Sequence, residues 1–332
     1  MADARAEALA RGLVAHLRTT LAAPALDLAE PPAVLRGGFD TEIFALRLRG
    51  GPPALAVPLV LRVLRAHHDP AMALREQATQ NALADLGFPA PRVLLATAEA
   101  APLGAPFVLM ERRPGRPLLE TRALGMGAVL ADLQLRLHAL DPAPLARALG
   151  PAGTYEGYLG AFERRITRGA RDGLRPLVGW LRAHRPPGDA PVVCHGDFHP
   201  QNILVEDGRV SGVLDWPNAL VAEPAFDVGS TLNILRFVPA GLVSVPFVLR
   251  WLMGVAQPLL ARRYLAVYRR GRAMDDERLA YYSVAAALRA LVRAGETRRR
   301  AAGGPPSALD ASPYAARLLE HVRRVTGLRA TP

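Results

Sequence analysis

Three polar residues in one short stretch, Asp197, Asn202 and Asp215, are of types that could carry out chemistry together. They lie within VVCHGDFHPQNILVEDGRVSGVLDWPNA, residues 192–219, where runs of Val, Ile and Leu surround them. Mg²⁺ prefers oxygen ligands, and a protein usually supplies one or two of them beside phosphates and water. We therefore expect Asn202 and Asp215 to bind Mg²⁺, and Asp197 to accept the proton of an attacking hydroxyl.

The residues between Asn202 and Asp215 predict the element that brings these two together. NILVEDGRVSGVLDW is typical of a β-hairpin that turns at Asp207-Gly208. A hairpin places the start of its first strand beside the end of its second strand. Before it, PVVCH predicts a short strand that leads into the loop of Asp197. Each polar residue alone would usually cap a turn. Together, their spacing matches the magnesium site of kinase-type phosphoryl transfer.

Other reactive residue types favour structural roles. Cys194 ends an apolar strand, where a thiol is usually packed rather than nucleophilic. We expect His195 to order the loop of Asp197, and His199 to bond loop backbone rather than assist near the phosphates. The pair His67-His68 precedes a helix start, which favours solvated or capping residues over a metal site.

Length and composition narrow the class of protein. A chain of 332 residues can bury a large core and favours two lobes. The single cysteine excludes an internal disulfide framework and fits a reducing compartment. The N-terminal stretch lacks the apolar region of a signal peptide, and the apolar stretch 238–249 is shorter than the roughly 18 residues that span a bilayer. We expect a cytoplasmic protein that does not bind membranes.

The net charge of +11 comes with an unusual composition, because all 41 basic residues are arginines and the chain contains no lysine. A Walker A phosphate loop and a lysine Schiff base are therefore excluded. The arginines are scattered along helical stretches without stacking aromatic residues, so the charge does not favour nucleic-acid binding.

The elements that must position these residues fall into two groups. The first contains strands and one main helix, and the second is mostly helical, which predicts an α+β fold with lobes at 1–112 and 113–332. We expect a helix at 3–22, a hairpin at 33–50, a strand at 54–65, a helix at 69–87, and strands at 91–99 and 105–112. Residues 295–313 are expected to form a loop before a last helix at 314–328.

The motifs HGDFHPQNILV and GVLDW resemble those of the aminoglycoside phosphotransferase/choline kinase-like family. The resemblance extends over roughly 30–240, from LRGGFDTEIFALRL to ALVAEPAFDVGSTL. It implies the bilobal protein-kinase-like fold, with an antiparallel sheet and one main helix in the N-lobe. The C-lobe would be mostly helical, carry the catalytic hairpin and supply the acceptor cleft.

The resemblance also implies a role for each matching residue. Asp197 would be the catalytic base, Asn202 and Asp215 the Mg²⁺ ligands, and Asp227 a support for the catalytic loop. The turn at Gly37 and Gly38 would cover the nucleotide. Arg62, paired with Glu76, would bind its α/β-phosphates. The backbone of Met110, Glu111 and Arg112 would bind its purine.

Three features depart from the protein-kinase pattern. Arg62 stands where protein kinases have lysine, and its planar fork must meet phosphates in a different geometry. Trp-Pro-Asn follows Asp215 in place of Phe-Gly, so kinase-style movement of that segment is not expected. The turn at Gly37-Gly38 lacks the full G-x-G-x-x-G pattern.

The implied activity is Mg²⁺-dependent transfer of a phosphoryl group from ATP or GTP to the hydroxyl of a small molecule, in a monomer or homodimer. Residues 216–332 contain 17 arginines against 8 acidic residues, a balance that disfavours a polycationic aminoglycoside. The apolar stretch 237–253 could line a pocket for a macrolide or be ordinary core, and a small metabolite is a third possible acceptor. A nucleotide-binding pseudokinase is the alternative, although it would be expected to lack Asp197, Asn202 or Asp215. A protein kinase is disfavoured by HGD and DWP.

Overall fold

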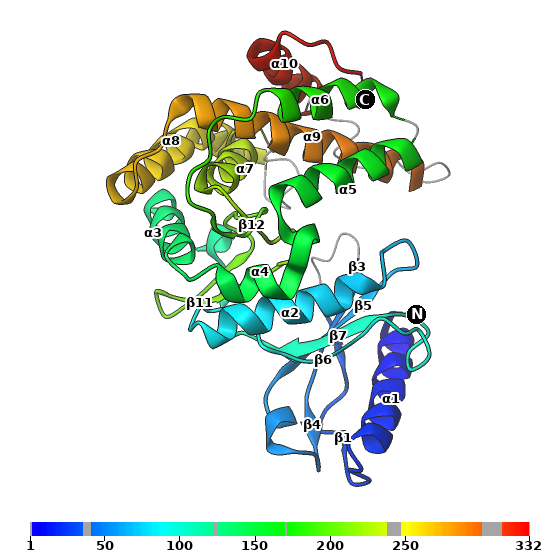
Figure 1. Ribbon diagram of the computed structural model, residues 1–332. Helices are drawn as coiled ribbons and strands as arrows, with labels where there is room; N and C mark the ends of the chain where they lie inside the picture. The colour runs from blue at the N-terminus through cyan, green and yellow to red at the C-terminus, as the bar shows by residue number, and fades with distance from the viewer. Residues whose placement is uncertain are drawn as a thin grey trace. The chain divides into compact units, whose positions relative to one another are not determined.

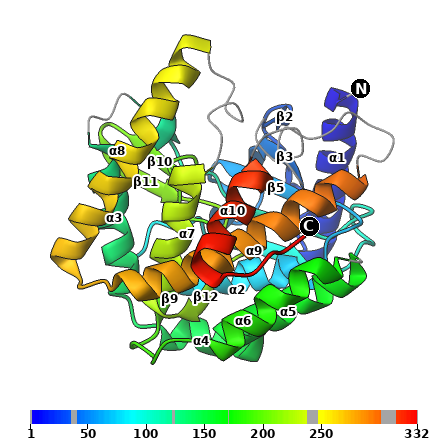
Figure 2. The same ribbon diagram turned by 90° about the horizontal axis from the view of Figure 1, so that it is seen from above.

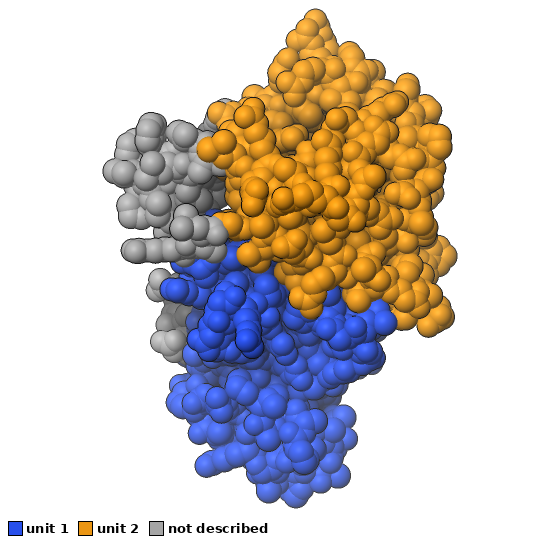
Figure 3. Space-filling model, turned by 90° about the vertical axis from the view of Figure 1, so that its left-hand side faces the viewer, with its two compact units in different colours: residues 1–121, 201–217 blue, residues 122–200, 218–332 orange. Residues whose placement is uncertain are grey.

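The structure is a computed structural model that describes residues 2–35, 41–121, 125–169, 171–237, 247–300 and 314–331 (Figure 1). The chain forms two compact units. The first comprises residues 1–121 and 201–217, and the second comprises 122–200 and 218–332 (Figure 3). The predicted lobes at 1–112 and 113–332 remain a prediction. The compact units differ from them in that the hairpin after Asp197 belongs with the N-terminal residues.

A five-stranded antiparallel sheet forms the centre of the first unit, in the order β2-β3-β5-β7-β6. Its strands are β2 (Ala33–Val34), β3 (Thr41–Leu46), β5 (Leu59–Leu64), β6 (Val93–Thr97) and β7 (Phe107–Glu111). The expected strand at 54–65 is therefore too long. Residues 53–55 form a 3₁₀ turn, because a Pro at the start of a helical turn is well tolerated and the strand begins only after Pro58.

Each face of this sheet is covered by one helix (Figure 1). Helix α1 (Ala2–Thr20) packs Leu9, Leu13 and Leu17 against Phe107 and other residues of one face. Helix α2 (Ala71–Asp85) lies on the opposite face, where Ala73 joins Val108 and Met110. The alternation along β7 follows from the two-residue period of a strand, and it buries both faces of the sheet.

Two smaller sheets complete the first unit. One pairs β1 (Asp27–Leu28) with β4 (Leu48–Arg49). The other has the order β11-β10-β8, with β8 (Arg116–Pro117), β10 (Ile203–Glu206) and β11 (Arg209–Val213). This sheet ties the hairpin that carries Asn202 and Asp215 to the chain just after β7.

The second unit is mostly helical and is built around the buried helix α7 (Pro224–Phe237). Figures 1 and 2 show α7 beside α8 (Phe247–Gly271) and α9 (Asp276–Arg300). The remaining helices are α3 (Met126–His138), α4 (Ala143–Leu149), α5 (Tyr155–Arg168), α6 (Arg175–Ala183) and α10 (Tyr314–Thr326). A two-stranded sheet of β9 (Val192–Cys194) and β12 (Leu220–Ala222) leads the chain into and out of the functional stretch.

The predicted α+β architecture is confirmed, with differences near the C-terminus. The expected loop at 295–313 is wrong in its first part, because α9 continues to Arg300 through residues that favour helix and tolerate one glycine. In the stretch 237–253, α7 ends at Phe237 and α8 begins at Phe247. The alternatives of a pocket or ordinary core depend on the side chains of Phe247 and Trp251, which the structure does not describe. Over the described ranges, no helix combines the length and the apolar character that crossing a bilayer requires.

Candidate active site

The β10–β11 hairpin positions the two predicted metal ligands. Its turn residues Asp207 and Gly208 have φ angles of 48° and 75°, the left-handed conformation that a tight two-residue hairpin needs. Ile203 pairs with Val213, and the N–H of Leu214 donates to the carbonyl oxygen of Asn202 at 2.7 Å. The hairpin therefore brings Asn202 and Asp215 to the same end of the ladder, as the sequence predicts.

Asp215 is held in a strained backbone conformation by the residue that follows it. Its φ angle is 67°, which costs a non-glycine residue about 1 kcal/mol, and its side chain remains 41% exposed. The indole of Trp216 is fully buried, donates to the carbonyl of Val213 at 2.8 Å and meets the ring of Phe88 edge-on. The Trp-Pro-Asn departure thus gives this segment a buried anchor.

Arg62 forms an ion pair with Glu76, the helix glutamate that the family resemblance assigns to it. Its Nη1 lies 2.9 Å from Oε1 of Glu76 and 3.3 Å from Oδ1 of Asp215. Burial alone would lower the pKa of Arg62, but the two carboxylates outweigh it and raise that pKa. Gln80 also donates to Oε1 of Glu76, at 2.9 Å. Strand β5, helix α2 and the hairpin thus meet at one guanidinium.

The Asn202 and Asp215 side chains fit a hard divalent cation by donor type, since both offer oxygen and Asp215 is accessible. Arg62 adds a second feature suited to a phosphate, because its Nε is buried without a hydrogen-bond partner among the described residues. A buried donor of this kind is costly unless a ligand satisfies it.

The other predicted nucleotide contacts are less defined. Gly37 and Gly38 lie outside the described residues. Met110 and Glu111 belong to β7, between β5 and β6. The N–H of Glu111 donates to Arg92 and that of Arg112 donates to Pro58, at 2.9 and 2.8 Å. These two donors are already used, so purine contacts from this segment would depend on neighbouring backbone groups.

Strand β9 leads directly into the loop of His195, Gly196 and Asp197, and Asp227 fixes this loop from α7. Its Oδ2 accepts the N–H of His195 at 3.1 Å, and its Oδ1 accepts that of Gly196 at 2.7 Å. The N–H of Asp197 donates to Nδ1 of His195 at 3.2 Å. The predicted supporting roles of Asp227 and His195 are confirmed by these bonds.

Asp227 also receives bonds from α3, which the sequence reasoning missed. Gln134 donates to its Oδ2 at 2.9 Å, and Nε2 of His138 lies 3.2 Å from the same atom. Burial alone would raise the pKa of Asp227, but these partners outweigh it and lower the pKa. Gln134 and His138 are four residues apart, a helical spacing that places both on one face.

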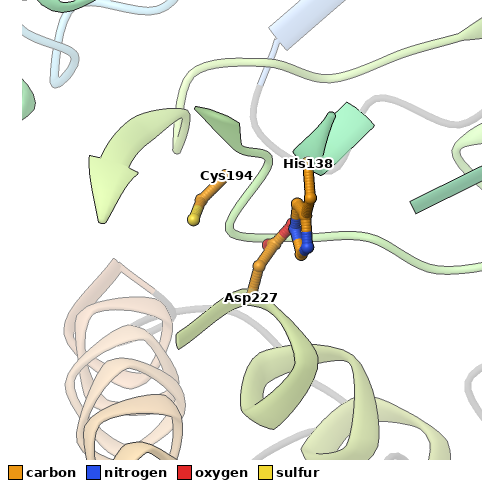
Figure 4. A group of neighbouring side chains, drawn as sticks. All are labelled: His138, Cys194 and Asp227. Carbon is orange, nitrogen blue, oxygen red and sulfur yellow. The ribbon is translucent and has the colours of Figure 1, made fainter. Parts of the chain in front are cut away.

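His138, Cys194 and Asp227 form a group whose potential ligand atoms all lie within 4.8 Å of one another (Figure 4). Both ring nitrogens of His138 have partners, since Nδ1 lies 2.7 Å from the hydroxyl of Tyr268. Burial raises the pKa of the Cys194 thiol well above its ordinary value, whereas a metal would bind the thiolate. The group is therefore better explained as support for the loop than as a metal centre, and Cys194 is packed as predicted.

Asp197 is buried and forms an ion pair with Arg289 of α9. Nη2 of Arg289 lies 2.8 Å from Oδ1 of Asp197, and the two side chains are 13% and 9% exposed. Burial alone would raise the pKa of Asp197, but Arg289, His199 and Arg293 outweigh it and hold the pKa below its ordinary value. Asp197 is therefore a carboxylate at neutral pH.

Arg289 is the principal residue that the sequence reasoning missed at this site. A usable signal was present, because Arg289 interrupts the apolar run VAAALRALV within a helix. Arginine is rarely buried unless it is paired. The sequence did not identify Asp197 as that partner, which lies 92 positions away.

Comparison with known proteins links this geometry to one family. Residues 33–273 match the model of the phosphotransferase enzyme family. An aminoglycoside 3'-phosphotransferase from Streptomyces fradiae is 28% identical over 260 residues, covering 74% of this chain and 90% of that protein. Acyl-CoA dehydrogenase family member 10 of Mus musculus is 30% identical over 169 residues, covering 46% of this chain and 16% of the relative. The chain thus matches only a small part of that longer protein.

The fold is shared with solved structures at low sequence identity. One is a thermostable mutant of aminoglycoside phosphotransferase APH(4)-Ia in ternary complex with AMP-PNP and hygromycin B. It is 16% identical, with a TM-score of 0.63 over 95% of this chain and 98% of the other. At this identity the likeness shows the protein-kinase-like fold alone.

Proposed function

Because the chain belongs to the phosphotransferase enzyme family, we propose that it transfers the γ-phosphoryl group of ATP, held with Mg²⁺, to a hydroxyl of a small molecule. The observation that supports this most is the ion pair of Arg62 with Glu76 beside Asp215, at the end of the hairpin. ATP is favoured as donor because the related fold binds AMP-PNP.

In this proposal, the residues of the first unit bind the nucleotide. Arg62 holds the phosphates, and its buried Nε gains the partner that the described residues do not provide. Asn202 and Asp215 would hold Mg²⁺, which when bound neutralises phosphate charge and favours in-line transfer.

Asp197 orients the acceptor and receives its proton. The hydroxyl oxygen forms a bond to the γ-phosphorus while the bond from phosphorus to the bridging oxygen breaks, and ADP leaves. The hydroxyl proton passes to the Asp197 carboxylate. Since Arg289 holds the pKa of this carboxyl low, proton transfer is expected late, when the attacking oxygen has lost most of its negative charge.

A product assay tests this function. The purified chain is incubated with MgATP or MgGTP and a panel of hydroxyl compounds, and phosphorylated product is detected by mass spectrometry. Wild type should form product and Asp197→Ala should not, while MgATP binding, measured by calorimetry, should survive in this variant. Failure of wild type to phosphorylate any acceptor, or equal turnover by the Asp197→Ala variant, would contradict the proposal.

The metal assignment has its own test. Asp215→Ala should weaken binding of MgATP more than binding of ATP in the presence of EDTA, because only the former uses the metal ligand. Equal loss in both conditions would show that Asp215 acts only through its contact with Arg62.

A further inference from the structure

The carboxylate proposed as the base faces a cationic surface of α9. Arg289 and Arg293 are four residues apart and therefore lie on the same side of this helix. Arg289 contacts Oδ1 of Asp197 at 2.8 Å, and Nε2 of His199 lies 4.0 Å from the same oxygen. The charge of Arg293 also acts on Asp197. An acceptor hydroxyl bonded to Asp197 would thus meet positive charge.

Two tyrosines near Asp197 are neutral groups. Tyr158 and Tyr314 are both close enough to Arg289 and Asp197 to interact with their charges. Burial raises the pKa of each phenol to about 12, so both remain protonated at neutral pH. The hydroxyl of Tyr158 donates to the carbonyl of Ala285 at 3.2 Å. Neither residue adds the negative charge that a cationic acceptor would need.

The position of Arg289 limits what can lie beside the reacting hydroxyl. A hydroxyl that gives its proton to Asp197 must approach within hydrogen-bond distance of this carboxylate. One of the two carboxylate oxygens already bonds Arg289, so substituents next to that hydroxyl come within reach of the guanidinium. A guanidinium carries five donors in a planar fork that matches carboxylate and phosphate oxygens.

We propose that the acceptor carries an anionic group, a carboxylate or a phosphate, near its reactive hydroxyl, and that Arg289 with Arg293 binds this group. This inference rests on the proposed phosphotransfer and names its substrate class. Arg289 then has two partners at once when an acceptor is bound, because Nη2 donates to Oδ1 of Asp197 while other N–H groups of the same guanidinium bind the anion. A cationic substituent, such as an amine of an aminoglycoside, would be repelled at this position.

Two series of related acceptors, whose members differ in the charge of one substituent, test the proposal. One series is glucuronate, glucose 6-phosphate, glucose and glucosamine, and the second is glycerate, glycerol 3-phosphate, glycerol and 3-aminopropane-1,2-diol. We expect kcat/KM to be at least about tenfold higher for an anionic member than for its cationic counterpart. The carboxylate and phosphate arms then distinguish the two anions.

Substitutions of Arg289 test whether this residue causes the preference for anionic acceptors. Arg289→Gln should lower kcat/KM with both acceptors, because Asp197 loses its ion-pair partner, but the loss should be at least about tenfold larger with the anionic acceptor, and this extra loss should appear mainly in KM. Arg289→Lys should recover part of the loss. Arg317→Gln, an exposed arginine on α10, is the matched control and should behave as wild type. Thermal melts confirm that each variant is folded.

Two further results separate this inference from the proposed function. Turnover of neutral or cationic acceptors at least as fast as anionic ones would overturn the inference while leaving phosphotransfer intact. If no acceptor is phosphorylated, the proposed function fails. Calorimetry of glucuronate and glycerol 3-phosphate binding then tests Arg289 directly, and binding unchanged or undetected in both wild type and Arg289→Gln overturns the anion site.

Discussion

Oδ1 of Asp227 accepts the backbone N–H of Gly196 at 2.7 Å, so a carboxylate of α7 holds the loop that carries Asp197. Its second oxygen accepts the N–H of His195 at 3.1 Å. The loop geometry therefore depends on an ionised side chain buried in the helical unit. Backbone N–H groups that point at one carboxylate also exclude many alternative conformations of the loop.

Replacing Asp227 should affect both folding and turnover. Asp227→Ala removes the buried carboxylate that accepts two backbone N–H groups and contacts the side chains of Gln134 and His138. The loss of these bonds should lower the free energy of unfolding by about 3–5 kcal/mol. Asp227→Asn should cost less, yet lower kcat by about a hundredfold through misplacement of Asp197. Urea unfolding and product formation measure the two effects. The exposed Glu320, changed to Ala, is the control, and an equal loss there would contradict the assignment.

Gly196 and Gly208 provide a matched pair of substitutions in the same stretch. Both have left-handed backbone, with φ of 76° and 75°. A Cβ on Gly196 would lie 2.5 Å from the carbonyl oxygen of Asn218, whereas one on Gly208 would meet nothing within 4 Å. Gly208→Ala should therefore cost only the backbone strain of about 1–2 kcal/mol. Gly196→Ala should lower the free energy of unfolding by more than this and should also reduce kcat. Urea unfolding and turnover measure the two effects. Equal effects of the two substitutions would contradict the close contact at Gly196.

Local pattern was sufficient to predict the hairpin that carries Asn202 and Asp215. Asp207-Gly208 is a strong turn signal that pairs the strands on its two sides, so both residues could be placed at one end of the ladder, although the pairing shifts between Leu204 and Val205. The ends of other elements were less predictable. The strand expected from residue 54 begins at Leu59, because Pro52 and Pro53 favour a short turn that hydrophobicity alone does not reveal.

The missed contacts all join elements distant in the sequence. Arg289 and Asp197 are 92 positions apart, and Gln134 and Asp227 are 93 apart. A periodic pattern shows that a helix face is buried, but it does not say which element covers it. Arg62 with Glu76 was found only because a family resemblance supplied the pairing.

We expect Arg62 to bind the nucleotide through the geometry of its guanidinium as well as through its positive charge. Arg62→Lys keeps a cation but loses the guanidinium, whose Nη1 contacts both Glu76 and Asp215 and whose buried Nε is left to bind phosphate, so the KM for MgATP should rise about tenfold. Arg62→Ala leaves Glu76 buried without its cation and should also lower the free energy of unfolding by about 3–5 kcal/mol. Arg92→Lys is the control, because its pair with Asp85 is exposed. A KM for MgATP in Arg62→Lys equal to that of wild type would remove Arg62 from nucleotide binding.

A separate cavity of about 260 Å³ in the helical unit is lined by His321, a histidine that should respond to pH. Nε2 of His321 lies 2.7 Å from Oγ of Ser283, and Nη2 of Arg324 lies 3.0 Å from Nδ1. Ser283 already donates to the carbonyl of Ala280, so His321 donates from Nε2 and accepts at Nδ1. Burial, together with the charges of Arg324 and Arg236, lowers the pKa of His321 to about 4.

Acid should therefore destabilise the fold through His321. A histidine whose pKa is lower in the folded chain contributes stability that is complete above its unfolded pKa of about 6.5 and is lost as pH falls toward 4. Protonation at Nδ1 would remove the acceptor of Arg324 and place a second cation beside it. His321→Gln should flatten the loss of unfolding free energy between these pH values by about 1–2 kcal/mol, while the exposed Leu259, changed to Gln, should leave it unchanged. Urea unfolding across this pH range measures the slope, and identical slopes for wild type and His321→Gln would show that His321 is not the group that titrates.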